Sequence, residues 1–257
     1  MPSEQSSSPE RDAKTSFRTI GLIGRLGSAK VVDTLKRLIR FLDQRGHHVI
    51  IEDRTATVLL DHGHVESSRR MLGQLCDLVI VVGGDGSLLG AARTLCHSGT
   101  LVLGVNRGRL GFLTDISPDE LEARVGEVLD GHYEVEERFL LDAELYRDGT
   151  LMGSGDALNE VVLHPGKAVR MIEFELFIDG QFVYSQRSDG LIIATPTGST
   201  AYSLSGGGPI MHPKLDVVTL VPMFPHTLSS RPIVIDAASE IRIHIGETNQ
   251  TYPHISC

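Results

Sequence analysis

The apolar and polar positions of the first hundred residues follow the pattern of strands that alternate with helices. Four short apolar runs are typical of buried strands, and they lie at 17–24, 48–52, 78–82 and 100–106. After the first run, apolar residues recur at helical spacing from Val31 to Leu42, which predicts a helix that ends near Gly46. We expect further helices at 65–75 and from Ser87 onward. This alternation predicts a parallel sheet with helices on both faces.

The second half of the chain has a different pattern, in which apolar and polar residues alternate one by one. Strand-like runs lie at 141–146, 171–184, 191–194, 219–221, 233–235 and 241–245. The Asp-Gly pairs at 148–149 and 179–180 are typical of tight hairpin turns. A helix with a proline at its first position is expected from Ser117 to about Asp130, ahead of these strands. The second half is therefore predicted to be mainly antiparallel β-sheet.

These patterns divide the chain into three segments. Residues 1–16 are polar and poor in apolar side chains, and we expect a disordered tail there. Residues 17–116 form the expected α/β domain with a parallel sheet. Residues 117–257 combine the linking helix with the mainly antiparallel, β-rich domain.

Composition narrows the class of protein without indicating an activity. The chain has 257 residues, of which 41% are hydrophobic and 22% charged, as expected for a globular protein. Its formal net charge of −9 argues against binding to nucleic acid or to an acidic membrane surface. Three cysteines without CxxC spacing, the lack of an apolar stretch of about 20 residues and the lack of a hydrophobic signal region together predict a cytoplasmic protein.

The central apolar run ends in a glycine loop, Gly83-Gly84-Asp85-Gly86, and helical sequence resumes at Ser87. Glycines let the backbone approach an anion closely, and the first N–H groups of a helix point at it, so this loop predicts a phosphate socket. The carboxylate of Asp85 would repel phosphate unless it holds a metal ion, accepts a proton or binds a sugar hydroxyl. The alternative interpretation is a tight strand-to-helix turn in which Asp85 is the N-cap.

A second glycine-rich region extends over 188–213. It combines glycines with Thr and Ser hydroxyls and with Tyr202, a set that suits a sugar–phosphate ligand and an aromatic ring that stacks on adenine. A long hairpin connection is the alternative. A separate candidate is the adjacent pair Asn159-Glu160, which could bind a ribose diol or an exocyclic amine through paired hydrogen bonds. The alternative interpretation is that these two residues form a turn.

Three charged residues near this region are further candidates. Asp189 lies at its start, Arg187 lies just upstream, and Arg170 is a candidate for a phosphate contact. The sequence contains no HExxH, no GxSxG elbow and no GxxxxGK[ST] loop, which weighs against metalloproteases, α/β-hydrolases and P-loop enzymes.

Five segments together resemble the bacterial NAD kinase family. In chain order they are VVGGDGSLLGAAR, GVNRGRLGFLTD, LNEVVLHPGK, DGLIIATPTGSTAYSLSGGGPIMHP and PHTLSSRPIVI. GGDG alone is shared with lipid kinases and the phosphofructokinase group, whereas the other segments in this order are specific. The resemblance covers about 17–257 and implies an α/β nucleotide domain followed by a β-rich domain. It also implies transfer of the γ-phosphoryl group of ATP to the 2′-hydroxyl of the adenosine ribose of NAD, which gives NADP.

The resemblance also assigns roles to individual residues. It implies that Asp85 is the catalytic acceptor and that the phosphate loop consists of Gly83, Gly84, Gly86 and Ser87. The NAD-binding residues that it implies are Asp85, Gly86, Asn159, Glu160, Arg170, Arg187, Asp189, Thr200, Ala201, Tyr202, Ser203, Leu204 and Ser205. It assigns no side chain as a metal ligand, and Mg²⁺ or another divalent cation would accompany ATP.

The family's assembly and two departures from its pattern add expectations. Members are commonly homodimers or homotetramers whose NAD site is completed across a subunit contact, so Arg170 would lie at the rim or come from a partner subunit. Arg187 matches a basic position that accompanies preference for NAD over NADH. Many relatives have Asp where Glu160 stands, so this contact would reach one methylene further. Relatives continue past Cys257, and we expect the β-rich domain to be truncated at its C-terminal end.

Two other functions share part of the pattern. A lipid or sphingoid kinase shares GGDG, but it would need an apolar entrance, and the second glycine-rich region carries hydroxyls instead. A nucleotide sensor without chemistry would use the same pocket, but a pure binder gains nothing from a carboxylate in its phosphate loop. Formation of NADP from ATP and NAD separates the three.

Overall fold

The computed structural model describes residues 17–107, 113–114, 116–167, 170–227, 229–246, 249 and 252–257. The expected tail at 1–16 and residues 108–112 and 115, which belong to the segment GVNRGRLGFLTD, lie outside these residues. The chain forms two compact units, the first of which ends at Val135 and the second of which begins at Glu136.

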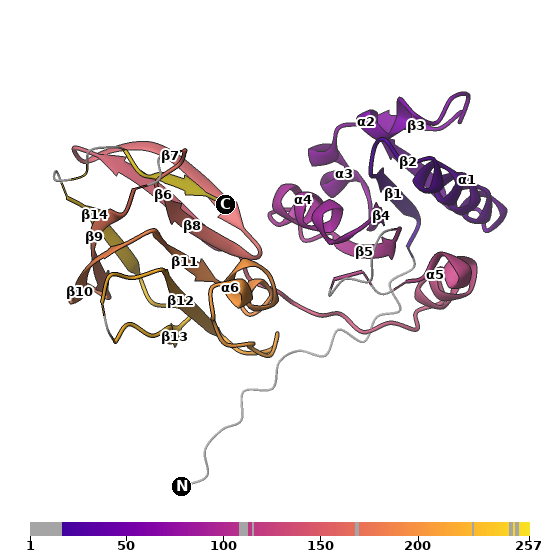
Figure 1. Ribbon diagram of the computed structural model, residues 1–257. Coiled ribbons are helices and arrows are strands. Elements are labelled where there is room, and N and C mark those ends of the chain that lie inside the picture. The colour runs from indigo at the N-terminus through magenta and orange to yellow at the C-terminus, as the bar shows by residue number, and fades with distance from the viewer. Residues whose placement is uncertain are drawn as a thin grey trace, which may run out of the picture. The chain divides into compact units, whose positions relative to one another are not determined.

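The first unit contains a five-stranded parallel sheet with the strand order β3-β2-β1-β4-β5 (Figure 1). Its strands are β1 (Thr19–Gly24), β2 (His48–Glu52), β3 (Val65–Ser67), β4 (Leu78–Gly83) and β5 (Leu101–Asn106). Its helices are α1 (Ala29–Gln44), α2 (Asp53–Ala56), α3 (Arg69–Leu75), α4 (Asp85–Leu95) and α5 (Leu121–Leu129), with the 3₁₀ turn η1 (Pro118–Glu120) ahead of α5. The expected parallel sheet is confirmed.

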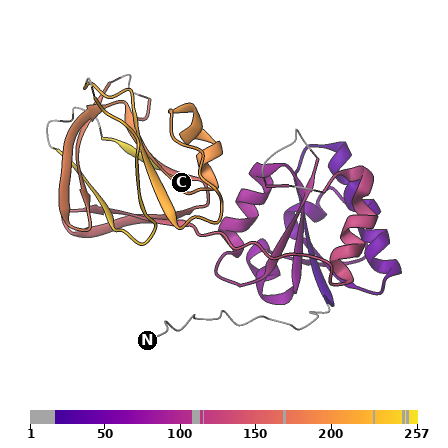
Figure 2. The same ribbon diagram turned by 90° about the horizontal axis from the view of Figure 1, so that it is seen from below.

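Helices cover both faces of this sheet because successive side chains of a strand point to opposite faces. Ile20 and Leu22 of β1 pack in one apolar cluster with α1 and α5, whereas Ile23 packs in a second cluster with α3 and α4. The two pairs of helices accordingly lie on opposite sides of the strands (Figures 1 and 2). Every residue of β4 is buried, as expected for an inner strand of a parallel sheet that is covered on both faces.

The helix expected over 65–75 is wrong at its beginning. The structure has strand β3 there, and α3 begins only at Arg69. Val65 pairs with Ile50 at the edge of the sheet, and the hydroxyl oxygen of Ser68 caps α3 by accepting the N–H of Met71. A three-residue edge strand that is largely exposed has no apolar run to reveal it in the sequence.

The predicted helix start at Ser117 is confirmed. The Ser117 hydroxyl oxygen accepts the backbone N–H of Asp119, and Pro118 occupies the first turn, which is 3₁₀ before α5 begins. Leu121 and Val125 of α5 are buried in the same cluster as α1. The structure therefore groups this helix with the parallel sheet of the first unit.

The second unit consists of antiparallel strands, as predicted. Sheet order is β13-β12-β11-β8-β15 in the largest sheet, β10-β9-β14 in the next, and β6-β7 in a hairpin. The strands are β6 (Leu141–Arg147), β7 (Thr150–Ala157), β8 (Glu160–His164), β9 (Ile172–Ile178), β10 (Gln181–Ser188), β11 (Gly190–Ala194), β12 (Val217–Met223), β13 (Ile233–Asp236), β14 (Ile241–Ile245) and β15 (His254–Ser256). Two short turns, η2 (Gly198–Thr200) and α6 (Tyr202–Ser205), interrupt the strands.

The two larger sheets enclose the apolar core of this unit. Phe174 and Leu176 of β9 face Leu191 of β11 and Leu220 of β12 across that core, and all four side chains are fully buried. Both Asp-Gly hairpin turns are confirmed, because the two residues of each pair have the positive φ angles that such turns require. Among the described helices, none combines the length and apolar character needed to cross a membrane.

Candidate functional site

The glycine loop lies at the point where the strand order of the parallel sheet reverses. The chain proceeds from β1 towards β3 on one side and from β4 towards β5 on the other, so β1 and β4 are neighbours whose following segments diverge. Ligands of open α/β sheets bind outside the carboxyl ends of the strands at such a reversal. Gly24 and Gly83 end these two strands, and the N–H of Arg25 donates to the carbonyl oxygen of Val82 at 3.0 Å.

Asp85 is the first residue of α4, and its carboxylate is directed towards another loop. Gly84 is the N-cap and Asp85 Oδ1 accepts hydrogen bonds from the N–H of Leu113 and the hydroxyl of Thr114, each at 3.3 Å. Thr114 is buried, whereas Asp85 is half-buried. The alternative in which Asp85 serves as the N-cap is therefore wrong. A carboxylate in the first turn of a helix is also stabilised by the helix dipole.

The loop glycines leave space on one side and are tightly packed on the other. A Cβ at Gly83 would lie 2.3 Å from Ser87 Oγ, and the Gly83 carbonyl accepts the N–H of Arg107 at 2.6 Å. A Cβ at Gly84 or Gly86 would meet nothing within 4 Å. The contacts at Gly83 thus fix the loop on one side. The open space beside Gly84 and Gly86 can admit a ligand close to the backbone, as a phosphate socket requires.

A buried ion pair next to this loop was not predicted from the sequence. Glu52, only 2% exposed at the end of β2, accepts a hydrogen bond from Arg69 Nε at 2.7 Å and another from the Thr55 hydroxyl at 2.6 Å. The Thr55 oxygen in turn accepts the N–H of Gly24 at 2.9 Å. This network fixes the carboxyl end of β1. A carboxylate in the last position of an otherwise apolar strand is the signal that could have indicated it.

In the second unit, Asn159 and Glu160 each carry a buried polar atom that has no partner within the described part of the chain. Among the described residues, none forms a hydrogen bond with Asn159 Oδ1 or Glu160 Oε2, although both atoms are shielded from solvent. Burial raises the pKa of Glu160 above its ordinary value, because desolvation disfavours the carboxylate. Buried polar groups in proteins nearly always have a partner, so this pair indicates a place that a ligand fills.

The turn before η2 packs directly on the backbone of Asn159. The Asn159 carbonyl accepts the N–H of Thr195 at 2.9 Å, and a Cβ at Gly198 would lie 2.0 Å from that same carbonyl oxygen. Only glycine fits this close approach. The second glycine-rich region is therefore a packed support for Asn159 and Glu160 and not merely a hairpin connection.

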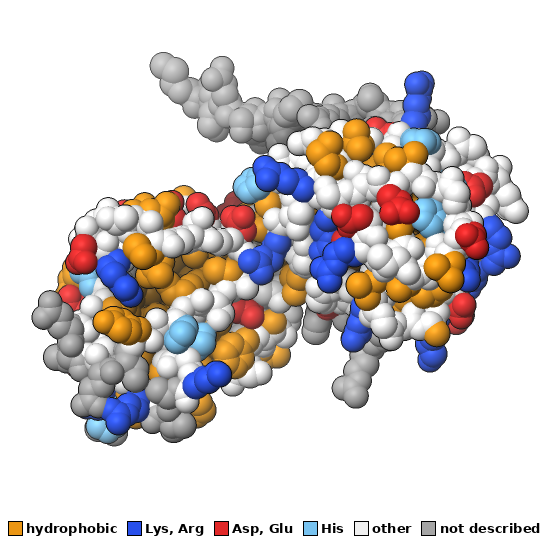
Figure 3. Space-filling view, turned by 90° about the horizontal axis from the view of Figure 1, so that it is seen from above, with side chains coloured by type: hydrophobic (Ala, Val, Ile, Leu, Met, Phe, Trp, Pro, Cys, Tyr) orange, Lys and Arg blue, Asp and Glu red, His pale blue; other side chains and the backbone are white. Residues whose placement is uncertain are grey.

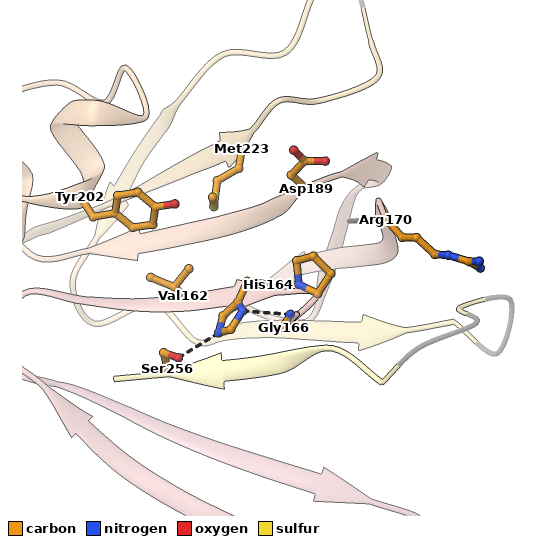
Figure 4. Close-up of a pocket in the computed structure, with 9 residues that line it drawn as sticks. Val162, His164, Gly166, Arg170, Asp189, Tyr202, Met223 and Ser256 are labelled. Carbon is orange, nitrogen blue, oxygen red and sulfur yellow. Dashed lines mark hydrogen bonds between the residues drawn. The ribbon is translucent and has the colours of Figure 1, made fainter. Parts of the chain in front are cut away.

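A cavity of about 490 Å³ lies beside this region (Figure 4). The residues that line it are Val162, His164, Pro165, Gly166, Arg170, Asp189, Tyr202, Met223 and Ser256. Three of the predicted NAD-binding residues, Arg170, Asp189 and Tyr202, thus come together, although the Arg170 guanidinium extends away from the other side chains drawn. Apolar side chains also gather in a hollow on the face of this unit drawn in Figure 3.

His164 is a cavity residue that sequence reasoning missed. The N–H of Gly166 donates to His164 Nδ1 at 3.1 Å, so the neutral ring carries its proton on Nε2, which lies 2.9 Å from the Ser256 hydroxyl (Figure 4). Alternation along β8 puts Glu160, Val162 and His164 on one face, and this spacing could have indicated the contact.

The remaining predicted residues are not part of the cavity lining. Arg187 is exposed on β10. Ser203 is buried, and its Oγ has no hydrogen-bond partner among the described residues. Leu204 and Ser205 are exposed on α6, whereas Thr200 and Ala201 are half-buried at the preceding turn.

Comparisons with known proteins agree over most of the chain. Family models described as the ATP-NAD kinase N-terminal domain and the ATP-NAD kinase C-terminal domain match residues 20–133 and 158–256. The NAD kinase of Chromohalobacter salexigens is 76% identical over 241 residues, which cover 94% of this chain and 82% of that protein. An NAD kinase of Pseudomonas fluorescens is 67% identical, with 94% of this chain and 81% of that protein covered.

Two solved structures have the same fold. The structure of yeast NADH kinase in complex with NADH matches with a TM-score of 0.85 and 26% identity, covering 94% of this chain and 78% of that one. An NAD kinase from Archaeoglobus fulgidus in complex with ATP matches with a TM-score of 0.65 and 24% identity, covering 92% of each chain. From the high identity of its bacterial relatives and the match to both domain models, this chain belongs to the NAD kinase family.

Proposed function

We propose that this protein is an ATP-dependent NAD kinase. It transfers the γ-phosphoryl group of ATP to the 2′-hydroxyl of the adenosine ribose of NAD and so makes NADP. The observation that carries the proposal is the pair of buried acceptor atoms on Asn159 and Glu160, which lack a partner in the part of the chain that the structure describes, within a chain whose relatives are NAD kinases. Hydroxyl and amine groups of a nucleoside are hydrogen-bond donors that would satisfy both atoms.

The glycine loop supplies the second half of the proposed chemistry. Phosphoryl transfer has a loose transition state with charge on the phosphoryl oxygens, so positioning and electrostatics dominate catalysis. The open backbone at Gly84 and Gly86 and the N-terminus of α4 would receive those oxygens. The Mg²⁺ ion that accompanies ATP as substrate would add positive charge there.

Asp85 is proposed to orient the ribose hydroxyl and to accept its proton late in the reaction. Its contacts with Leu113 and Thr114 fix the direction of the carboxylate. A carboxylate is a weak base towards an alcohol, which is a far weaker acid than a carboxylic acid. Orientation of the hydroxyl is therefore expected to contribute more than basicity.

The other assignments follow the same reasoning. Arg170, Asp189 and Tyr202, which share one cavity, are proposed to contact NAD, and Thr200, Ala201 and 203–205 to complete the pocket. Arg187, exposed on β10, is proposed to favour NAD over NADH from a position that a subunit contact would bring to the site. A cytoplasmic homodimer or homotetramer is proposed on the same family resemblance.

The Asp85→Asn variant tests the proposal. Asparagine keeps an oxygen acceptor for Leu113 and Thr114, so the variant is expected to fold, whereas kcat should fall roughly 10²–10⁴-fold because the carboxylate is lost. Protein, ATP, Mg²⁺ and NAD are incubated, and NADP is measured with an NADP-specific dehydrogenase. The matched control is Asp33→Asn on the exposed face of α1, which should keep wild-type turnover.

Two outcomes would contradict the proposal. Failure of the wild-type protein to form NADP would exclude the activity, and would direct attention to a lipid kinase or a nucleotide sensor. Turnover by Asp85→Asn close to that of the wild type would remove Asp85 from the mechanism while leaving the activity itself in place.

A further inference from the structure

Arg138 connects the segment ahead of β6 to the glycine-rich region of the second unit. Its guanidinium donates to Thr197 Oγ1 at 3.1 Å and forms an ion pair with Glu136 at 2.8 Å. The Arg138 side chain is 20% exposed, against 51% for Glu136. Arg138 is therefore mostly enclosed at its contact with Thr197, which lies between β11 and η2.

The turn that carries Thr197 is fixed by contacts that do not involve Arg138. The Thr195 hydroxyl accepts the N–H of Gly198 at 3.1 Å and donates to the carbonyl oxygen of Leu158 at 2.6 Å. Gly198 itself lies against the carbonyl of Asn159. Loss of the Arg138 contact would therefore leave this turn in place and release only the half-buried side chain of Thr197.

The direction of the hydrogen bond determines what Thr197 can offer a ligand. Arginine has donors and no acceptor, so Thr197 Oγ1 must act as the acceptor towards Arg138. The hydroxyl proton then remains available to donate elsewhere. The next residue, Gly198, packs against the backbone of Asn159, and the side chains of Asn159 and Glu160 carry buried acceptor atoms that have no partner among the described residues. Thr197 thus offers a hydroxyl donor on the turn that packs against Asn159.

We propose that Arg138 is a positioning residue for NAD, which acts by holding the Thr197 hydroxyl as a donor to an acceptor atom of the bound nucleotide. The inference rests on the proposed NAD kinase function. A hydrogen bond formed equally in the ground state and in the transition state changes KM and leaves kcat unchanged. Arg138 should therefore affect the use of NAD and leave the use of ATP unaltered.

The test compares Arg138→Ala, Thr197→Val and the double variant. Each single variant is expected to raise KM for NAD about tenfold, with kcat and KM for ATP within twofold of wild type, because a hydrogen bond with a charged partner is lost or misdirected. The double variant should have the same KM for NAD as Thr197→Val alone, since Arg138 acts only through Thr197. Arg138→Lys keeps a donor and should restore part of the affinity.

The matched control is Arg242→Ala, since Arg242 pairs with Glu240 on the exposed part of β14. It should leave both KM values unchanged. Direct titration of NAD into each protein without ATP measures the same ratio of affinities independently of turnover. If Arg138→Ala does not fold by circular dichroism, Thr197→Val, which keeps every backbone contact of the turn, carries the test.

Three results would overturn the inference. They are an NAD affinity of Arg138→Ala or Thr197→Val within twofold of wild type, single-variant effects that multiply in the double variant, and an equal loss for ATP. Failure of the wild-type protein to make NADP while it still binds NAD would contradict the proposed function alone, and the affinity ratios would still decide the role of Arg138.

Discussion

Glu160→Gln is expected to make the protein more stable and less able to bind NAD. At neutral pH, Glu160 holds a buried carboxylate oxygen with no partner among the described residues, and burial raises its pKa. A carboxyl group whose pKa is higher in the folded state stabilises the protein at a pH below its unfolded pKa, which is about 4.3 for glutamate. This stabilisation is lost as the pH rises through the folded pKa. The ionised form therefore opposes folding at neutral pH.

The expected magnitude follows from the cost of an unpaired buried group. Leaving such a group unsatisfied costs roughly 1–3 kcal/mol, and glutamine retains part of that cost because its amide is also buried. A gain of about 1 kcal/mol is expected, which corresponds to about 4 °C in the melting midpoint of a unit of this size. KM for NAD should rise about tenfold, because a neutral amide replaces a charged acceptor.

Thermal melts followed by circular dichroism between pH 8 and pH 4 measure the effect. The stabilisation should be largest at neutral pH and should shrink as the pH falls towards 4, where wild-type Glu160 also becomes neutral. Glu175→Gln, at an exposed position of β9, is the matched control and should change the midpoint little at any pH. A Glu160→Gln variant that melts below wild type at neutral pH, or that binds NAD as tightly as wild type, would refute the reasoning.

Two further substitutions test the supports of the site. Gly198→Ala should abolish NAD binding, because its Cβ would lie 2.0 Å from the Asn159 carbonyl oxygen, whereas Gly153→Ala, whose Cβ would meet nothing within 4 Å, should be neutral in an NAD titration. Glu52→Gln should lower the free energy of unfolding in urea by about 3 kcal/mol, since it breaks a buried ion pair. Glu122→Gln breaks an ion pair that is partly exposed, and it should lower the free energy of unfolding by less than about 1 kcal/mol. Equal losses for Glu52→Gln and Glu122→Gln would contradict the role of burial.

The sequence predicts the fold wherever an element buries a continuous apolar face. The strands 78–83 and 48–52 and the helix with its apolar face from Val31 to Leu42 were predictable, because burial dictates their residue types. Strand β3 was not, because it lies at an edge with little to bury. Such a strand is specified by the neighbour it pairs with, and that neighbour is known only once the fold is known.

The candidate site divides in the same way. The glycine loop around Asp85 is visible in the sequence because its residues are consecutive. The ion pair between Glu52 and Arg69 and the contact of His164 with Ser256 are not, since their partners lie 17 and 92 positions apart along the chain. The lack of a partner for Asn159 Oδ1 among the described residues also cannot be read from a motif, because it depends on all the residues packed around that atom.

The order in which the strands of each unit follow one another along the sequence has a consequence for synthesis on the ribosome. All strands and helices of the first unit precede Val135, so a nascent chain can complete that unit while the remainder is still being translated. The second unit differs, because β8 lies between β11 and β15, and β15 begins only at His254. Until β15 emerges, one edge of β8 offers unpaired amides and carbonyls to other nascent chains, which exposes this sheet to misassembly during translation.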